Sequence, residues 1–566
     1  MTIPDSVRSR LAALAALLAL VLMAAGPPPA DATTGDPEPA AAPAPDAARL
    51  RKLQEKLADL DLYRGPIDGR QSPALAAALL SFLQSAGLPP DTAADDALLD
   101  RLEAAIRLQR LTRFLTTLGR EQSEQARAAL LSQPATRDLV APPGGPAAPG
   151  GAPPTAGAVF ACLRTLTATC LIDAAIEASQ AIEETRLRDW ALSEIVKAQA
   201  RADADDAARA TIRRISDARQ IIVSLRDVAS IQAERRAIDA ALTTARSIPD
   251  ALARIEAELA VAAVQVEAGA AEGAQASLAL ADQALPQVSE PLQRVALRAR
   301  IASLRWHAGD RAGGDAALAA ARDEIRTLTS RDGRATGVGF VATALAETGR
   351  PAEAVHLITE NRIANDAPAA LAAAAGASAQ AHDPSEAERI AALIAEPRFR
   401  AVALVQLAAI ARRQNDPARA GDLLTEANQA TAAIDEAGWR DYPLSRIAQG
   451  YLDLKQPIPG AAAARAIGDA GMRARLLFLV SHLQAAQGAP DTLGTASEAE
   501  RTAATITAPL DECWTLTEVA RGFADVDDRT AARAMLQRAA EVAAAIQEPA
   551  SRARAFSRVA SVMLGL

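Results

Sequence analysis

The chain is poor in aromatic residues: Phe, Trp and Tyr make up 3% of its 566 residues, although 50% are hydrophobic. β-Sandwiches and barrels need aromatic and β-branched side chains to fill their sheet faces, so an all-β fold is excluded. About a quarter of the chain is alanine, the residue with the highest helix propensity. The length also exceeds what one hydrophobic core sustains. The composition therefore predicts several units built from stacked helices.

Lysine is almost absent, because Lys52, Lys56, Lys197 and Lys455 are its only occurrences and the other basic residues are arginine. The formal net charge of the chain is -9. Such a balance gives no broad attraction to phosphate backbones or anionic lipids, although a local basic patch is compatible with it. We therefore expect no nucleic-acid partner.

Cysteine is also scarce: Cys162 and Cys170 lie close together and Cys513 stands alone. Three cysteines build no disulfide framework. On one straight helix, a separation of eight residues would place the first two about 12 Å apart, too far for a disulfide. A local disulfide therefore requires a break in the helix between them. The alternative is that the thiols are buried and pack like alanine.

Motifs of catalysis and metal binding are missing. The four histidines are scattered at no metal-ligand spacing, and neither His-Glu-x-x-His nor paired Cys-x-x-Cys occurs. There is no Gly-x-Ser-x-Gly elbow and no phosphate loop. We therefore expect no catalytic residues, no metal and no cofactor. A hydrolase with an unrecognised site is the weakest alternative.

Long hydrophobic runs are missing except at the start of the chain. Residues 1–32 have the pattern of a signal peptide: two arginines, an apolar run from Leu11 to Ala25, and the small-x-small site Ala30-Asp31-Ala32. A membrane anchor is the alternative, but the run is shorter than the roughly 20 residues that span a bilayer. We expect cleavage before Thr33, no membrane span afterwards, and a periplasmic or secreted protein of the bacterial envelope.

Two segments rich in proline divide the chain. The first is a Pro/Ala linker and the second is the Pro/Gly sequence PPGGPAAPGGAPPTAG. They predict a small N-terminal module and a large C-terminal one. The expected organisation is a signal peptide at 1–32, linkers at 33–48 and 142–157, a small domain at 49–106, a helical extension at 107–141, and a repeat domain at 158–566.

The small module has the pattern of three helices. Leucines at helical spacing from Leu50 to Leu60 predict the first, a second begins at Pro73 and ends at Gly87, and Asp95 or Asp96 can cap a third. The unusual part is the Asp68-Gly69 turn between the first two helices, where glycine frees the backbone and aspartate can accept hydrogen bonds from the following amides.

These residues resemble the peptidoglycan-binding-like domain over about 49–106. The positions that match its pattern are Leu53, Leu57, Tyr63, Pro66, Asp68, Gly69, Pro73, Ala78, Phe82, Gly87, Leu88, Asp91 and Leu99. The departures are Ser72, Leu75, Leu83 and Thr92, which lie in or beside the loops. The resemblance implies non-catalytic attachment to peptidoglycan, with glycan-binding candidates Tyr63, Asp68, Gly69, Phe82 and Asp91. The alternative is that the Asp-Gly loop only caps the second helix.

The large module is repetitive. Turn signals recur between apolar helical segments, from Gly269 through Gly309 and Gly349 to Asp525–Asp528, at separations of 33 to 40 residues. An apolar-Ala pair precedes each turn and a small residue follows it. The spacing of Leu407, Ala420, Leu424 and Ala427 is similar to that of a tetratricopeptide repeat. The resemblance implies an all-α fold with a right-handed α-solenoid of about ten helix-turn-helix units from Arg188 onward, the second unit (218–248) being degenerate.

Rigid aromatic and arginine side chains are the candidates for a protein-binding groove in this module. They are Trp190, Trp306, Trp514, Arg412, Arg413 and Arg521. The alternative is that each tryptophan fills a gap between alanine-rich repeats.

The sequence as a whole therefore predicts a non-catalytic envelope scaffold. Its N-terminal module would bind peptidoglycan, and its repeats would bind a protein partner that the sequence does not name. The alternative is a degenerate wall module, with the protein acting only as a protein-interaction regulator of a cell-envelope enzyme.

Overall fold

The computed structural model describes residues 47–140, 162–525 and 527–566, and all regular elements in these ranges are helices. The prediction of an all-α fold is confirmed. The predicted signal peptide and the 142–157 linker lie outside the described residues, as does nearly all of the 33–48 linker. None of the helices in the described part of the chain is both long and apolar enough to cross a membrane.

The described residues form two compact units, one up to Thr117 and one from Leu118 to the end. The helix α4 (Asp96–Ser132) runs through the point of division, so each unit contains part of it. The predicted helical extension at 107–141 is therefore shared between the two units.

The N-terminal unit consists of α2 (Ala47–Asp59), α3 (Pro73–Ser85) and the first part of α4. The ends of these helices follow from capping residues. The Ser72 hydroxyl accepts a hydrogen bond from the Leu75 amide at the start of α3, and the Asp95 carboxylate accepts one from the Leu98 amide at the start of α4. The predicted three-helix arrangement is confirmed, and its core contains Leu53, Leu57, Leu83, Leu98 and Leu102.

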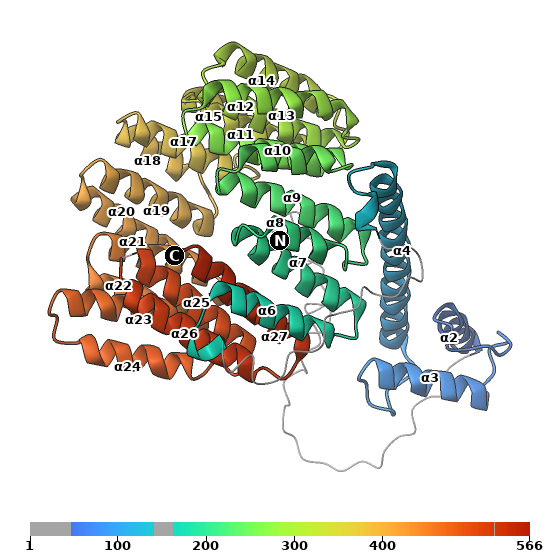
Figure 1. Cartoon of the computed structure of the whole chain (residues 1–566). Coiled ribbons are helices and arrows are strands. Elements are labelled where there is room, and N and C mark those ends of the chain that lie inside the picture. The colour runs from blue at the N-terminus through green and yellow to red at the C-terminus, as the bar shows by residue number, and fades with distance from the viewer. Residues whose placement is uncertain (1–46, 141–161, 526) are drawn as a thin grey trace. The chain divides into compact units, whose positions relative to one another are not determined.

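The larger unit is an array of helical hairpins (Figure 1). The first helix of each hairpin belongs to what we call the first layer and the second helix to the second layer. The first layer consists of α7 (Thr185–Arg201), α9 (Ala218–Glu234), α11 (Ala251–Glu267), α13 (Pro291–His307), α15 (Arg331–Glu347), α17 (Pro368–Gln380), α19 (Pro397–Arg413), α21 (Ala437–Asp453), α23 (Ala470–Ala486), α25 (Pro509–Asp525) and α27 (Pro549–Leu564). The second layer consists of α8 (Asp205–Ile212), α10 (Ile238–Ser247), α12 (Ala271–Ala284), α14 (Arg311–Ile325), α16 (Pro351–Glu360), α18 (Pro384–Ala392), α20 (Pro417–Ala432), α22 (Pro457–Arg465), α24 (Thr492–Ala503), α26 (Arg529–Ala545) and α6 (Ala168–Gln180). Two short 3-10 turns, Arg137–Leu139 and Leu285–Gln287, complete the elements.

Each hairpin turn contains one residue with left-handed backbone, a conformation that favours glycine. These residues are Asp203, Arg236, Gly269, Gly309, Gly349, His382, Asn415, Lys455, Gly488 and Asp527. They lie 33 or 40 residues apart, except for a last interval of 39. The prediction of about ten repeated units is confirmed, but the second unit is not degenerate, because α9 and α10 form a regular hairpin around Arg236. Its turn escaped detection because it contains no glycine, asparagine or proline.

Small residues stand where the two helices of a hairpin cross, as the sequence predicts. A Cβ atom at Gly314 would lie 3.0 Å from the Ala302 carbonyl oxygen, so the helices approach too closely for a larger side chain. Leu407, Ala420, Leu424 and Ala427 are all buried. The residues that carry the repeat pattern are therefore the ones that pack the hairpins together.

The array closes into a ring. Each helix of the first layer contacts the next, from α7 through α25 to α27, and α27 in turn contacts α7. The helix α6, the first of the repeat region, pairs with the last helix, α27, and serves as its second-layer partner. The two helices lie side by side in Figure 1. The predicted solenoid is thus a closed ring of eleven hairpins, the last of which joins the two ends of the repeat region.

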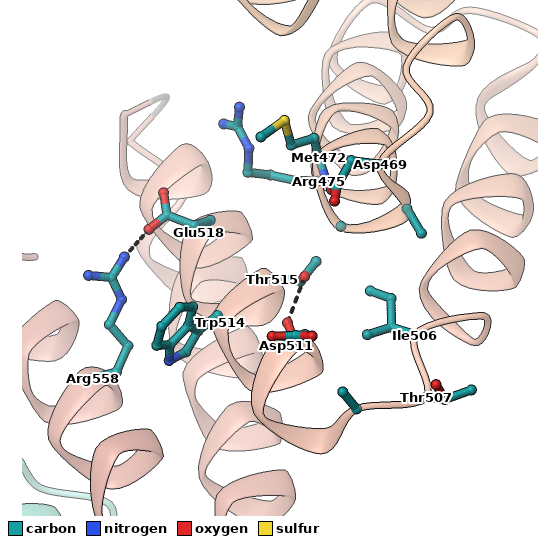
Figure 2. Close-up of a pocket in the computed structure, with 13 residues that line it drawn as sticks. Asp469, Met472, Arg475, Ile506, Thr507, Asp511, Trp514, Thr515, Glu518 and Arg558 are labelled. Carbon is teal, nitrogen blue, oxygen red and sulfur yellow. Dashed lines mark hydrogen bonds and ion pairs between the residues drawn. The ribbon is translucent and has the colours of Figure 1, made fainter. Parts of the chain in front are cut away.

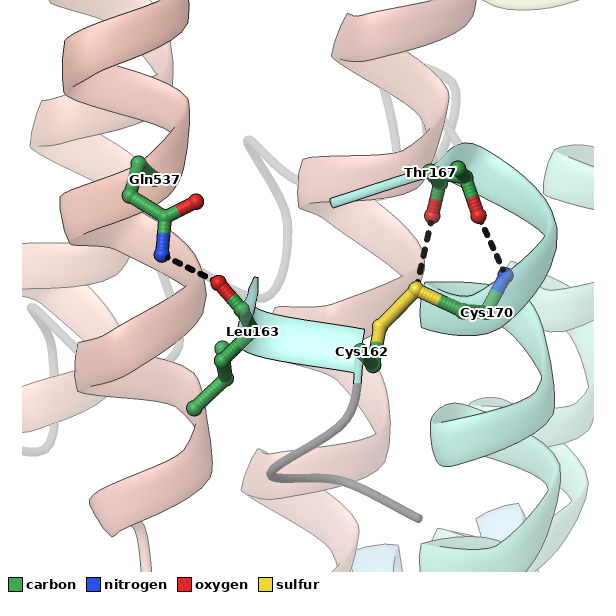
Figure 3. Close-up of a disulfide and its surroundings, with 5 residues drawn as sticks. All are labelled: Cys162, Leu163, Thr167, Cys170 and Gln537. Carbon is green, nitrogen blue, oxygen red and sulfur yellow. Dashed lines mark hydrogen bonds between the residues drawn. A yellow bond between two sulfur atoms is a disulfide. The ribbon is translucent and has the colours of Figure 1, made fainter. Parts of the chain in front are cut away.

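A disulfide stands at the start of α6, between Cys162 and Cys170 (Figure 3). Their Cα atoms are 5.6 Å apart, because the helix is interrupted between them and resumes at Ala168, after the Thr167 cap. The Gln537 side-chain amide of α26 donates a hydrogen bond to the Leu163 carbonyl, 2.8 Å away. Of the two alternatives left open by the sequence, the local disulfide with a helix break is the one found. Cys513 is the buried thiol, and burial raises its pKa to about 12.

Candidate functional site

In the N-terminal unit, the Asp-Gly loop is held by the buried side chain of Gln54 on α2. The Gln54 amide nitrogen donates to Asp68 at 3.1 Å and to the Arg70 carbonyl at 3.0 Å, and its oxygen accepts from the Gly69 amide at 2.8 Å. Asp68 also accepts a hydrogen bond from the Arg70 amide. This bond and the Gln54 bond lower the pKa of Asp68. The loop is therefore preorganised by one side chain that lies beneath it.

Gly69 is required by this geometry. Its φ angle is 74°, and an added Cβ atom would lie 2.4 Å from the Ala47 carbonyl oxygen. Tyr63 is 4% exposed, and its hydroxyl donates to the Pro66 carbonyl at 3.0 Å. Tyr63 thus stabilises the turn that precedes the Asp-Gly loop.

In the ring, two tryptophans from distant parts of the chain lie on either side of one arginine. The Arg554 guanidinium carbon of α27 is 3.5 Å from the ring centre of Trp190 on α7 and 5.2 Å from that of Trp514 on α25. The tryptophans are 39% and 40% exposed. Stacking of this kind is favourable because the arginine cation lies over the negative faces of the indole rings. The ring closure therefore creates an exposed aromatic-arginine cluster.

A pocket of about 560 Å³ adjoins this cluster (Figure 2). Arg475 and Met472 come from α23, and Trp514 and Glu518 come from α25 on the other side of the pocket. Arg558 of α27 forms an ion pair with Glu518. Asp469 and Asp511 also line the pocket, which thus combines cationic, acidic and exposed apolar groups.

The charges in this pocket are partly removed from water. Burial lowers the pKa of Arg475, and the neighbouring charge of Arg446 lowers it further, while Glu518 raises it. Burial likewise lowers the pKa of Arg521, as do the neighbouring charges of Arg558 and Arg201. An arginine remains protonated in proteins, so these shifts reflect the burial of its charge rather than a change of protonation state.

A second pocket, of about 570 Å³, is lined by five consecutive first-layer helices, α13 to α21. His307, Glu347, Gln406, Arg413 and Arg446 are among its lining residues. Because one hollow is shared by five neighbouring helices, the exposed side of the first layer is concave there. We call this side of the first layer, which also carries the first pocket, the inner face.

Residues 46–102 match the family model described as "Putative peptidoglycan binding domain". These residues form a domain of that family. The resemblance read from the sequence at about 49–106 is thereby confirmed, and α2, α3 and the start of α4 are its three helices.

One relative is the "Localization factor PodJL" of Caulobacter vibrioides, found for strains NA1000 / CB15N and ATCC 19089 / CIP 103742 / CB 15. It is 42% identical over 67 residues, which are 12% of this chain and 7% of the relative. The chain thus spans a small fraction of the length of the relatives that it matches.

Solved structures similar to this chain include three proteins of low sequence identity. Ton1535 from Thermococcus onnurineus NA1 has 14% identity and a TM-score of 0.27, covering 58% of this chain and 98% of that one. The signal transduction ATPase PH0952 from Pyrococcus horikoshii, with a tetratricopeptide repeat sensor, has 11% identity and a TM-score of 0.22, covering 64% and 63%. A circular tandem repeat protein has 13% identity and a TM-score of 0.17, covering 92% and 97%.

The glycan-binding candidates occupy different places in the peptidoglycan-binding domain. Tyr63 and Phe82, which is 5% exposed, belong to the core, and Gly69 is a buried residue of the Asp-Gly loop itself. Asp68 and Asp91 are exposed. The buried candidates shape the domain and offer no surface for a ligand.

Two exposed residues beside the Asp-Gly loop were missed by the sequence. Ile67, which directly precedes the Asp68-Gly69 pair, is 47% exposed, and Arg70, which directly follows the pair, is also exposed. An isoleucine in a loop on the surface of a domain is the signal that could have identified the site.

The groove candidates separate into two groups. Trp190, Trp514 and Arg521 lie around the ring closure, and Arg413 lines the second pocket. Trp306 lies instead between two arginines: its ring centre is 5.3 Å from the guanidinium of Arg311 in its own hairpin and 4.6 Å from that of Arg350, which precedes α16 of the next hairpin. Arg412 lies 3.9 Å from Asp453.

Arg475, Arg554 and Arg558, which complete the cluster at the ring closure, were not among the residues predicted from the sequence. No local signal marks them, because their neighbours are brought together only by closure. Within the ranges that the structure describes, no three His, Cys, Asp or Glu side chains are grouped so that they could hold a metal ion.

Proposed function

We propose that this chain is a non-catalytic scaffold of the bacterial cell envelope. The N-terminal domain binds peptidoglycan, and the inner face of the helical ring binds a protein partner. The observation that carries the first half is the family match over residues 46–102. It also supports a location in the envelope, where peptidoglycan is found.

The second half is supported by the inner face of the ring. Exposed tryptophan and arginine, which dominate the binding energy of many protein interfaces, gather beside a pocket large enough for several side chains. Attachment of the domain to the wall would raise the local concentration of such a partner there. The relative named as a localization factor fits this role, in which the protein determines where a partner is found.

Cosedimentation with purified peptidoglycan sacculi tests the wall-binding half. The two units share α4, so the full chain is the appropriate sample and point variants are preferable to excision. The variant Ile67→Ser with Arg70→Ala removes exposed apolar and cationic groups beside the loop while leaving its backbone hydrogen bonds in place. We expect at least a tenfold loss of binding to sacculi.

The matched control is Leu108→Ser with Arg101→Ala, which removes the same kinds of exposed group from α4. It should bind like the unmodified chain. Failure of the unmodified chain to cosediment would contradict wall binding. It would favour the alternative that the protein acts only as a protein-interaction regulator of an envelope enzyme.

A further inference from the structure

The inner face carries an arginine on every first-layer helix from α19 to α27. They are Arg413 on α19, Arg446 on α21, Arg475 on α23, Arg521 on α25, and Arg554 and Arg558 on α27. Arg413 and Arg446 line one of the two pockets, and Arg475 and Arg558 line the other. The helices α21 and α23, which carry Arg446 and Arg475, contact each other, and the charge of Arg446 acts on Arg475. We call this set of six residues the arginine strip.

Most of the strip is not neutralised by the protein itself. Within the described residues, the guanidinium groups of Arg413, Arg446, Arg475 and Arg554 form no ion pair with a carboxylate. The Nε atoms of Arg554 and Arg558 are buried without a hydrogen-bond partner. Glu518 forms ion pairs with Arg521 and Arg558 of the strip, and Asp469 and Asp511 also line the first pocket without pairing with an arginine of the strip.

This arrangement stands out in a chain whose net charge is -9. Like charges held together and partly buried raise the free energy of the ring. An anionic ligand would reduce both the repulsion and the unmet hydrogen bonding. Guanidinium groups also bind carboxylates with paired hydrogen bonds.

Apolar surface lies along the same strip. Trp190 and Trp514 are exposed on either side of Arg554, and Met472 is exposed in the pocket beside Arg475. A purely ionic polymer would leave these side chains uncovered. A peptide can cover them, because it carries acidic and apolar side chains on one backbone.

We infer that the arginine strip binds an extended acidic peptide segment, with glutamate or aspartate side chains on Arg446 and Arg475 and an apolar side chain on Trp514. This names the class of partner for the ring in the proposed function, and it does not depend on wall binding. Five neighbouring helices at about 9 Å spacing span roughly 36 Å, which corresponds to about eleven residues of extended chain.

Fluorescence anisotropy of a labelled probe peptide tests the inference with the full chain. The probe consists of four Glu-Ser-Leu triplets, and a second probe has glutamine in place of each glutamate. We expect saturable binding of the first probe at low salt, weakening as salt increases, and no binding of the second. The double variant Arg446→Gln with Arg475→Gln should weaken binding at least tenfold.

The control double variant is Arg326→Gln with Arg389→Gln, which changes the net charge equally at exposed positions outside the strip. It should bind the probe like the unmodified chain. If Arg446 and Arg475 stabilise the fold, their double variant will have a lower melting temperature than the unmodified chain. We expect an equal or higher melting temperature, because the variant removes two cations that lack an ion-pair partner.

Three outcomes would overturn the inference. They are no binding of the glutamate probe, an equal loss in the control variant, and displacement of the probe by single-stranded DNA at lower concentration than by unlabelled peptide. The sacculus assay of the N-terminal domain is independent of all three, so failure of one proposal is distinguishable from failure of the other.

Discussion

At the scale of single residues, Glu258 is the least favourable buried group in the ring. It lies on α11, is 2% exposed, and its Oε2 atom has no hydrogen-bond partner. Burial raises its pKa from 4.5 to about 7, although Arg254 and Arg246 oppose the shift. The folded state therefore binds a proton that the unfolded state releases, so stability is greatest below about pH 4.5 and falls as the pH rises to about 7.

We therefore predict that Glu258→Gln stabilises the protein near pH 8, by up to about 3 kcal/mol, because the neutral amide has no charge to desolvate. Near pH 5 the two proteins should unfold at nearly the same urea concentration. The measurement is the urea midpoint of the circular dichroism signal at both pH values. The control is Glu256→Gln on the same helix: Glu256 accepts a hydrogen bond from Arg226 at 2.8 Å, so its loss should not stabilise. A pH-independent effect of Glu258→Gln would contradict the explanation.

The candidate site shows which residues sequence reasoning can identify. Trp190 and Trp514 were predicted because rigid aromatic side chains are suited to a protein-binding groove. Their partner Arg554 was not, because the chain contains many arginines and their roles depend on contacts across the ring closure. Tyr63 and Phe82 were predicted because they match the family pattern. That pattern does not distinguish core residues from surface residues, and both side chains are buried.

At the scale of helices and turns, the sequence predicted most of the ring because glycine and Asn-Asp-Pro sequences mark the hairpin turns. The turns at Asp203 and Arg236 have the same left-handed backbone without such a residue, and these were missed. The intervals of 33 and 40 residues differ by seven, which is two helical turns, so the buried side of the helix is retained. The longer units have second helices of 14 to 16 residues in α12, α14 and α20.

The turns allow a test of backbone strain with little change in packing. We predict that Lys455→Gly stabilises the protein by about 0.5 kcal/mol, because a left-handed conformation costs more for lysine than for glycine. The opposite substitution, Gly349→Ala, should destabilise by about 1 kcal/mol. A Cβ atom at Gly349 would have no neighbour within 4 Å, so steric conflict is not the cause. Shifts of equal sign in the urea midpoints of the two variants would contradict this account.

At the scale of the whole repeat region, closure of the ring is the feature that local patterns do not encode. The cluster of Ala178, Ile182, Ala191, Ala550 and Ala553 joins the two ends of the array, yet each of these residues looks like any other small or apolar helix residue. An array of repeats closes only if small rotations between successive units add up to a full turn, and a single sequence does not report these rotations.

In the closed ring, α6 covers one face of α27, as the second helix of each other hairpin covers the first. We predict that a chain starting at Glu183, which lacks α6, loses slow hydrogen exchange in α27, because the face that contains Ala553 becomes exposed. A chain starting at Cys162 retains α6 and its disulfide and should keep α27 protected. Both truncations lack the N-terminal domain and the packed end of α4, so the difference between them isolates α6. Equal exchange of α27 amides in both chains would show that the ring closes through α7 and α27 alone, with α6 only an accessory to it.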